Sequence, residues 1–155
     1  MPNWILNTLL VILAFIFMEA VAWLAHKYIM HGWLWRLHKD HHEPNTNKAI
    51  EHNDSFFLIF ATPAIVCFYI GFDDFSLPFW IAVGITMYGI AYFFIHDLFI
   101  HQRIKILRNA NSLYFRAVRR AHKTHHKHLG KEDGECFGML LPSLKYFKEA
   151  RKNAR

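Results

Sequence analysis

Three long apolar runs, almost free of charge, set the strongest limit on how this chain can fold. They cover residues 4–25, 56–72 and 77–95, and Glu19 is the only charged residue in them. A 22-residue helix covers roughly 33 Å at about 1.5 Å per residue, enough to cross a hydrocarbon core about 30 Å thick. The second run is at the short limit, and Pro63 is expected to kink it. We therefore predict an all-α integral membrane helical bundle with three transmembrane helices.

The composition agrees with membrane insertion. Hydrophobic residues make up 54% of the chain and charged residues 19%, whereas soluble domains carry about a quarter charged residues. The length of 155 residues corresponds to one domain. We expect a single membrane domain over residues 1–155, with cytosolic histidine segments at 26–55 and 96–130 that form a helical cap, and a basic tail at 131–155.

The basic residues indicate how the chain is oriented. Of the 18 Lys and Arg, four lie in residues 27–48 and fourteen in residues 103–155. Three crossings place both segments on one side, which the positive-inside rule makes cytoplasmic, with the N-terminus outside. The alternative is a fourth crossing over residues 136–146. That crossing would be short, would contain Pro142 and would export the basic tail, so we expect this segment at the interface or packed against the cytosolic part.

Other features exclude several classes of protein. Cys67 and Cys136 lie far apart, so neither a disulfide framework nor a thiolate metal site is expected. The absence of a basic region before the first apolar run argues against a cleaved secretory signal. The sequence contains no nucleic-acid motif, Gly-rich phosphate loop or nucleophile elbow. Electrons for any redox reaction would therefore have to come from a separate protein.

Ten of the twelve histidines form a doubled pattern, in which H-x4-H is followed by H-x2-H-H. The first copy is His26, His31, His38, His41 and His42, and the second is His96, His101, His122, His125 and His126. Each H-x4-H lies at the cytosolic end of a predicted span, and each H-x2-H-H lies on a more polar segment. A solvated cluster of interfacial histidines would not need this repeated spacing.

The spacing predicts which imidazoles point together. Residues three and four apart share a helical face, so each H-x2-H-H is expected to project its three imidazoles in one direction. Residues five apart diverge by about 140° on an α-helix. His26 and His31 would share a site only if the helix ends or bends between them, as Gly32 allows, or they would bind different metals. The His96–His101 pair has no such glycine and is less explained. The last H-x2-H-H segment is expected to be helical up to Gly130.

Three spans would bring all four histidine motifs to the cytoplasmic end of the bundle. Imidazole suits Zn, Cu, Fe and Ni, so the ligand type alone does not exclude zinc. Ten ligands are too many for one ion, whereas two six-coordinate ions with five ligands each would keep one open position per ion. Iron is favoured because iron–oxygen chemistry attacks the C–H bonds that an apolar setting offers. We therefore predict that these ten histidines hold two iron ions and that O2 binds at the open positions.

A few other polar residues are candidates for supporting roles. His52 and His128 lie outside the pattern and are expected to be surface or hydrogen-bonding residues. Glu19, seven residues before His26, can hydrogen-bond either an imidazole ligand or a neighbouring helix. Asp97 can orient a ligand from another helix or be an ordinary acid at a helix end. The acidic residues that the sequence cannot rank are Glu43, Glu51, Asp54, Glu132, Asp133 and Glu135.

Four stretches resemble the bacterial β-carotene hydroxylases, within the fatty-acid-hydroxylase and sterol-desaturase superfamily. They are MHGWLWRLHKDHHEP, EHND, HDLFIHQR and AHKTHHKHLGKEDGECFG, and they cover most of residues 26–138. The resemblance implies a membrane di-iron monooxygenase of carotenoid biosynthesis that hydroxylates β-carotene at carbon 3 of each β-ionone ring. The products would be β-cryptoxanthin and then zeaxanthin. It also implies metal ligation by the ten histidines, no catalytic residue beyond these ligands, and electrons from a ferredoxin-type donor.

Other functions compete with this interpretation. A fatty-acid or sterol hydroxylase or desaturase would share the same histidine pattern. A membrane metal transporter would place ligands deep within the spans, and a bis-histidine haem protein would place histidines opposite each other on facing helices. The basic tail, residues 131–155, could dock an acidic electron donor or anionic lipid, although the positive-inside bias alone accounts for most of its charge. A carotenoid substrate would enter from the bilayer because it is insoluble in water.

Overall fold

The structure, a computed structural model, describes residues 3–43 and 50–152. The elements in chain order are α1 (Asn3–Leu24), η1 (Ala25–Trp33), α2 (Trp35–His42), η2 (His52–Asp54), α3 (Ser55–Gly71), α4 (Leu77–Phe93), η3 (Phe94–Ile100), α5 (Leu113–His125) and α6 (Leu144–Lys152). The described residues contain no β-strand, which confirms the predicted all-α class. Residues 44–49 of the predicted histidine segment and the end of the basic tail, residues 153–155, lie outside the described residues.

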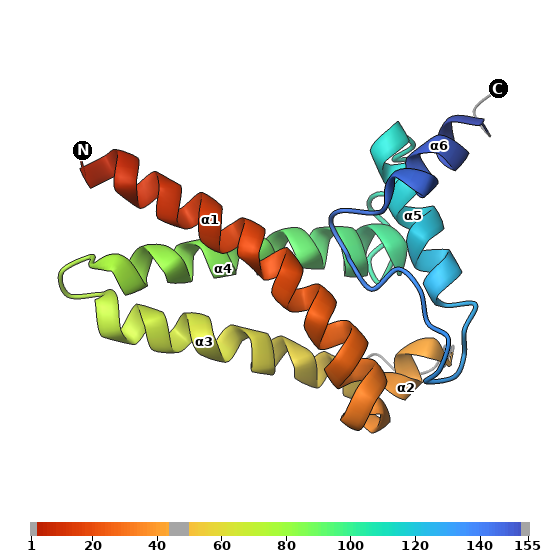
Figure 1. The fold of residues 1–155 in the computed structure, drawn as a ribbon, viewed down its shortest axis with the longest axis horizontal. Coiled ribbons are helices and arrows are strands. Elements are labelled where there is room, and N and C mark those ends of the chain that lie inside the picture. Colours follow the sequence, from red (N-terminus) through yellow and green to blue (C-terminus); the bar gives the residue numbers. More distant parts are fainter. Residues whose placement is uncertain (1–2, 44–49, 153–155) are drawn as a thin grey trace.

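Three helical stretches are long and apolar enough to cross a membrane: Asn3–Trp33, His52–Gly71 and Leu77–Ile100. Each is longer than the predicted run, because the first and third stretches continue into an H-x4-H motif and the second begins with η2. α3 and α4 form an antiparallel hairpin, and α1 lies across α4 (Figure 1). Gly84 permits this crossing, since a Cβ there would lie only 2.5 Å from the Val11 carbonyl oxygen. The chain is therefore an integral membrane protein.

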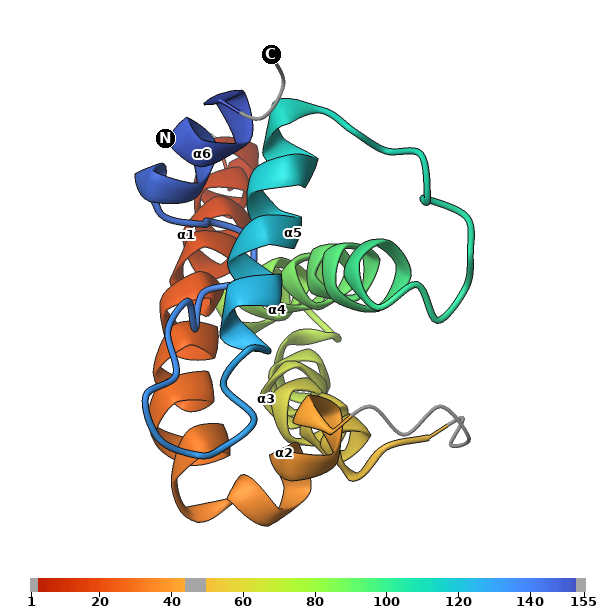
Figure 2. The same cartoon turned by 90° about the vertical axis from the view of Figure 1, so that its right-hand side faces the viewer.

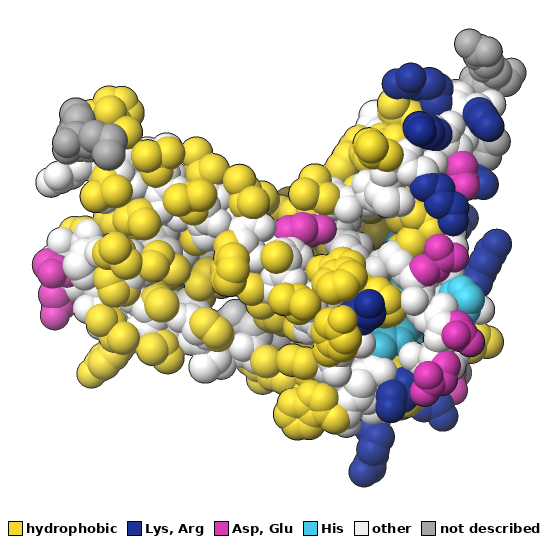
Figure 3. All heavy atoms as spheres, in the orientation of Figure 1, with side chains coloured by type: hydrophobic (Ala, Val, Ile, Leu, Met, Phe, Trp, Pro, Cys, Tyr) yellow, Lys and Arg dark blue, Asp and Glu magenta, His cyan; other side chains and the backbone are white. Residues whose placement is uncertain are grey.

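The polar part of the protein lies at one end of the spans. α2, α5 and α6 gather at that end, opposite the α3–α4 turn (Figures 1 and 2). In the space-filling view, hydrophobic side chains cover α1, α3 and α4, while Lys, Arg and the visible His side chains gather over the other end (Figure 3). This separation of apolar and charged surface matches the predicted helical cap.

α1 and α4 both continue into wider turns of π-helix. Leu34 N–H donates to the Ile29 carbonyl oxygen and His101 N–H to the His96 carbonyl oxygen, each five residues earlier. In η1 the helical backbone is interrupted at Gly32, with φ −104° and ψ −121°. Single π turns within α-helices are often found at functional sites. Both H-x4-H motifs lie on these wide turns.

The loop beyond α5 folds back along α1, and the described residues after α5 contain no further helix long enough to cross the membrane. α5 ends at His125, so the prediction of a helix up to Gly130 is wrong. The loop that follows runs beside α1 (Figure 2), where the backbone N–H groups of Met139 and Leu141 donate to the Glu19 carboxylate.

α6 has 9 residues, too few to span a bilayer, and it packs on α5. Ala117 and Ala121 of α5 form this contact with Tyr146 and Ala150 of α6. Because the alanine side chains are small and the Tyr146 ring is flat, the two helices approach closely. The segment predicted as interfacial or packed therefore packs against α1 and α5.

Candidate metal centre

The structure brings the histidines of the doubled pattern into two groups. Group A has ligand atoms that all lie within 4.8 Å of one another and consists of His26, His31, His38, His42 and His125. Group B meets the same limit and consists of His41, His96, His101 and His122. His126 lies beside group B, with its ring centroid 4.4 Å from that of His122 and 4.8 Å from that of His41. All ten predicted histidines thus gather at the polar end of the bundle.

The π-helical turns explain why histidines five residues apart share a group. A π-helix closes its hydrogen bond from i to i+5, so its turn brings residues five apart to the same face. The ring centroids of His26 and His31 lie 5.2 Å apart, and those of His96 and His101 lie 4.5 Å apart. The divergence of about 140° holds for a regular α-helix; the helix departs from that form at both turns, which is the condition under which the sequence allowed each pair to share a site.

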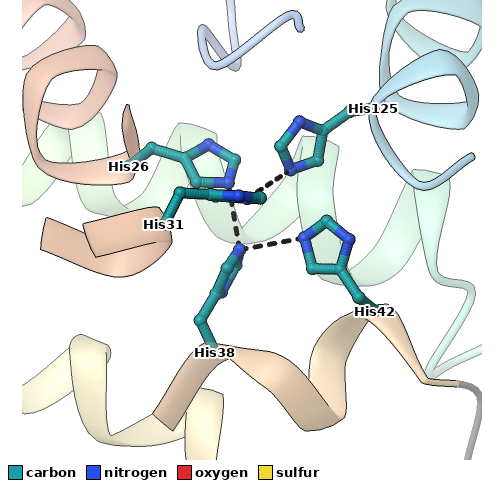
Figure 4. Close-up of side chains that lie close together, drawn as sticks. All are labelled: His26, His31, His38, His42 and His125. Carbon is teal, nitrogen blue, oxygen red and sulfur yellow. Dashed lines mark hydrogen bonds between the residues drawn. The ribbon is translucent and has the colours of Figure 1, made fainter. Parts of the chain in front are cut away.

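The three imidazoles of each H-x2-H-H motif lie together in the centre, with ring centroids within 6.2 Å of one another, but each motif is divided between the two groups. α2 contributes His38 and His42 to group A but His41 to group B. α5 contributes His125 to group A and His122 to group B. Figure 4 shows group A assembled from η1, which continues α1, from α2 and from α5. α2 and α5 therefore each contribute imidazoles to both groups.

Within each group the Nε2 atoms point at one another. In group A, His38 Nε2 lies 3.1 Å from His26 Nε2 and 3.2 Å from His42 Nε2 (Figure 4). His31 Nε2 and His125 Nε2 lie 3.2 Å apart.

Group B shows the same convergence. His41 Nε2 and His96 Nε2 lie 3.0 Å apart, and His101 Nε2 and His122 Nε2 lie 2.9 Å apart. His126 Nε2 is buried and has no hydrogen-bond partner among the described residues. A neutral imidazole has one nitrogen lone pair to offer. Converging lone pairs and a buried nitrogen with no partner are what a metal ion would satisfy.

The Nδ1 atoms of group A face away from the converging Nε2 atoms, and we call them the outer nitrogens. All five contact neutral oxygens. Nδ1 of His42, His31, His125 and His26 lies 2.8–3.3 Å from the backbone carbonyl oxygens of His128, Lys131, Glu135 and Phe137. The fifth, His38 Nδ1, lies 2.6 Å from Asn53 Oδ1. An Nδ1–H that donates outward leaves the lone pair on Nε2, which faces the centre of the group. The loop after α5 therefore orients four of the five imidazoles.

Carboxylates contact the outer nitrogens of two of the four histidines in group B. His41 Nδ1 lies 3.0 Å from Glu51 Oε2, and His96 Nδ1 lies 3.3 Å from Asp97 Oδ2. Arg103 joins these acids, with its guanidinium 3.3 Å from Glu51 and 3.1 Å from Asp97. Burial raises the pKa of the Glu51 carboxyl, and the charge of Arg103 opposes that shift.

Some of these histidines lie outside the spans. For them, burial favours the neutral imidazole, which is the form that binds metals. It lowers the pKa of His42 to about 4, and that of His125 and His126 to about 3 each. The neighbouring imidazoles lower these pKa values further, since a second positive charge close by is unfavourable. Near neutral pH each of these imidazoles therefore keeps one N–H and offers the lone pair of its other nitrogen.

The remaining predicted residues lie around the centre. His52 is exposed, and its ring lies 3.0 Å from Asp40 Oδ2, outside both groups. His128 belongs to neither group and contributes only its backbone oxygen. Asp97 contacts His96, its neighbour on the same turn, and not a ligand from another helix.

Glu19 contacts no imidazole. Its carboxylate accepts hydrogen bonds from Tyr88 Oη at 2.7 Å and from the backbone N–H groups of the loop after α5. Of the two roles left open by the sequence, the structure gives it the one that joins separate segments of the chain.

Asn53 and the loop carbonyls were not identified from the sequence. Asn53 precedes the second span, where an N-cap is the ordinary role for asparagine. Backbone carbonyls carry no sequence signal, because every residue has one.

An apolar cavity of about 590 Å³ leads from the membrane region to the centre. Its lining includes Phe60 and Ala64 of α3 and Gly89 of α4, and it reaches His96 and Asp97 at its polar end. His96 is the only histidine in that lining among the described residues, so the cavity opens on group B.

Comparison with known proteins agrees with the resemblance found in the motifs. The fatty acid hydroxylase family profile matches residues 11–147. The β-carotene hydroxylase of Pantoea ananas is 42% identical over 137 residues, which cover 88% of this chain and 78% of that protein. The β-carotene hydroxylase of Paracoccus sp. (strain PC1) is 38% identical over 148 residues, which cover 94% and 91% of the two chains.

A plant relative shares the same region within a longer protein. The chloroplastic β-carotene 3-hydroxylase 2 of Arabidopsis thaliana is 40% identical over 128 residues, which cover 80% of this chain and 41% of that protein. No solved structure matches the chain. Because the family profile covers residues 11–147, including all ten clustered histidines, the chain belongs to the fatty acid hydroxylase family.

Proposed function

We propose that this protein is a di-iron monooxygenase that hydroxylates carbon 3 of the β-ionone rings of β-carotene, giving β-cryptoxanthin and then zeaxanthin. The observation that carries the proposal is the apolar cavity that ends at His96 of group B. The relatives named β-carotene hydroxylases support the choice of substrate.

Each histidine group fits one iron ion. Group A offers five imidazoles, and group B offers four together with His126, whose buried Nε2 has no partner among the described residues. Imidazole is a suitable ligand for iron. Iron bound there would supply the O2 activation that hydroxylation of an unactivated carbon requires. The overall reaction takes R–H, O2, two electrons and two protons to R–OH and water.

The protein's own residues bind the substrate and keep water away. The cavity lining is dominated by aromatic and aliphatic side chains, including Phe56, Phe60 and Phe93, which suit an apolar polyene. Tyr92 lies over the His96 ring, with centroids 4.9 Å apart, and narrows the polar end. A substrate lying along α3 and α4 from the bilayer would bring its terminal ring to group B.

The two electrons come from a ferredoxin-type donor in this proposal, because the chain has no cofactor-binding motif of its own. The site faces the cytoplasm of a bacterial cell, with the N-terminus outside the cytoplasmic membrane, since both basic segments flank the histidine groups. Reporter fusions at either side of the spans test this orientation.

An acyl chain is the competing substrate, and the family's description favours it. The α3–α4 cavity would accept an acyl chain as well as a polyene. The metal-transporter alternative has less support, because the ligands gather at one end of the spans. Glu19, the only acid in the three apolar runs, accepts hydrogen bonds from protein groups.

Pigment chromatography of a β-carotene-producing host that expresses the protein tests the proposal. We expect zeaxanthin with the unaltered chain and nearly complete loss of it with His41→Ala. His52→Ala is the matched control, since its exposed ring lies outside both groups. Altered fatty acids or sterols with unchanged β-carotene would overturn the proposed substrate.

A further inference from the structure

The two histidine groups differ in the charge of the oxygens that hold their imidazoles. In group A, all five outer nitrogens contact neutral carbonyl or amide oxygens. In group B, His41 and His96 contact the carboxylates of Glu51 and Asp97. Both sites therefore offer imidazole nitrogens as ligands, but the carboxylates make the imidazoles of group B more electron-rich.

One short segment makes the contrast sharp. Glu51 directly precedes η2 and Asn53 lies in it, yet Glu51 contacts His41 of group B and Asn53 contacts His38 of group A. The two contacts are 3.0 Å and 2.6 Å long, so both are close enough to be hydrogen bonds. The chain thus places an acid on one group and an amide on the other.

Arg103 holds the acids of group B in place. Its guanidinium donates to Asp54 at 2.7 Å and to Glu51 at 3.3 Å, and it lies 3.1 Å from Asp97. Three carboxylates therefore surround one guanidinium, and the excess negative charge lies next to the outer nitrogens of His41 and His96 in group B.

We infer that the two iron positions are electronically unequal, and that the ion in group B is the more easily oxidised. This inference rests on the proposed function, because it requires an iron ion in each group. A carboxylate that accepts from an imidazole N–H raises the basicity of that ligand. A more basic ligand stabilises the ferric state over the ferrous state, which lowers the reduction potential. Glu51 and Asp97 are positioning residues that act through His41 and His96.

The order of oxidation has a spatial consequence. The cavity ends at His96 and Asp97, both of which belong to the carboxylate-supported side. The ion that gives up an electron first would therefore be the one nearest the substrate. Group A, whose outer nitrogens contact neutral oxygens and which contributes no histidine to the cavity lining, would hold its electron longer.

A redox titration of the 57Fe-loaded protein followed by Mössbauer spectroscopy tests this inference. Each couple transfers one electron from Fe(II) to a ferricyanide-type oxidant. We expect two iron signals of equal area that are oxidised one after the other. Glu51→Gln, which keeps an acceptor oxygen and loses the charge, should shift the first signal to a higher potential. A tenfold change in its Fe(III)/Fe(II) ratio corresponds to about 59 mV.

Asn53→Asp is the reciprocal variant, since it gives His38 of group A a carboxylate partner. It should shift the second signal to a lower potential and leave the first unchanged. Glu43→Gln is the matched control, because it removes an exposed carboxylate next to His42 that ion-pairs with Lys39. Both signals should keep their potentials in this control.

The outcomes separate this inference from the proposed function. Two iron ions that titrate together, or a Glu51→Gln variant that shifts the second signal or both signals equally, would overturn the inference and leave a di-iron site intact. A protein that binds no iron would overturn the proposed function and the inference together. Unchanged helical content by circular dichroism excludes misfolding of the variants.

Discussion

The Glu19 carboxylate, on α1, accepts a 3.1 Å hydrogen bond from the backbone N–H of Leu140, beyond α5. Met139 and Leu141 donate to the same carboxylate, as does Tyr88 of α4. This contact joins two spans to the loop whose carbonyls orient four imidazoles of group A. A polar residue inside a span thus supports the metal centre without touching it.

Replacing Glu19 should destabilise the protein and weaken metal binding by group A. Glu19→Ala leaves several N–H groups and the Tyr88 hydroxyl without an acceptor, at a cost of about 1–3 kcal/mol. Glu19→Gln should cost less, because its amide oxygen still accepts. Thermal unfolding in detergent and iron content measure both effects. Glu43→Gln is the control, and equal stability of all these variants would contradict the role given to Glu19.

His126→Ala should remove the iron of group B and spare that of group A. Its Nε2 is buried beside group B and has no partner among the described residues. We expect the iron content per chain to fall by about half and zeaxanthin formation to be lost. Plasma mass spectrometry of purified protein measures the metal, with His52→Ala as the control. Full iron content in His126→Ala would exclude this histidine as a ligand.

Filling the cavity should block the substrate without disturbing the metal. Gly89 lines the cavity, and a Cβ there would meet no atom within 4 Å. Gly89→Leu should therefore lower zeaxanthin formation at least about tenfold, equivalent to about 1.4 kcal/mol, at unchanged iron content. Met87→Leu, an exposed position on the same helix, should have little effect. Normal conversion by Gly89→Leu would show that the substrate binds elsewhere.

Acid should destabilise the metal-free protein. Histidines in the unfolded chain have a pKa near 6.5, whereas burial lowers the pKa of folded His42 to about 4 and of folded His125 to about 3. Below about pH 6.5 the unfolded state binds protons that the folded state does not, so stability falls as the pH falls. Each such histidine contributes up to about 1.4 kcal/mol per pH unit.

Thermal unfolding of chelator-treated protein between about pH 7.5 and about pH 5 measures this effect. The melting temperature should be level above about pH 7 and should decline below about pH 6.5. A melting temperature that rises on acidification would mean that the histidines are not buried as neutral groups.

The sequence predicted the spans and the gathering of the histidines because both depend on local patterns. An apolar run long enough to cross a bilayer has few other stable structures, and the doubled spacing singled out the ten histidines. The division into groups A and B was not predictable, since it depends on π turns at His26–His31 and His96–His101 that tertiary packing selects. The roles of Asn53 and of the loop carbonyls depend on contacts between distant segments, which no local pattern reveals.

Isotope labelling tests the central claim most directly. The purified, iron-loaded protein is supplied with β-carotene, a ferredoxin-type reducing system and 18O2, and the product is examined by mass spectrometry. We predict zeaxanthin in which both hydroxyl oxygens carry 18O. Hydroxyl oxygen derived from water, or unchanged β-carotene with an iron-loaded and folded protein, would contradict the account.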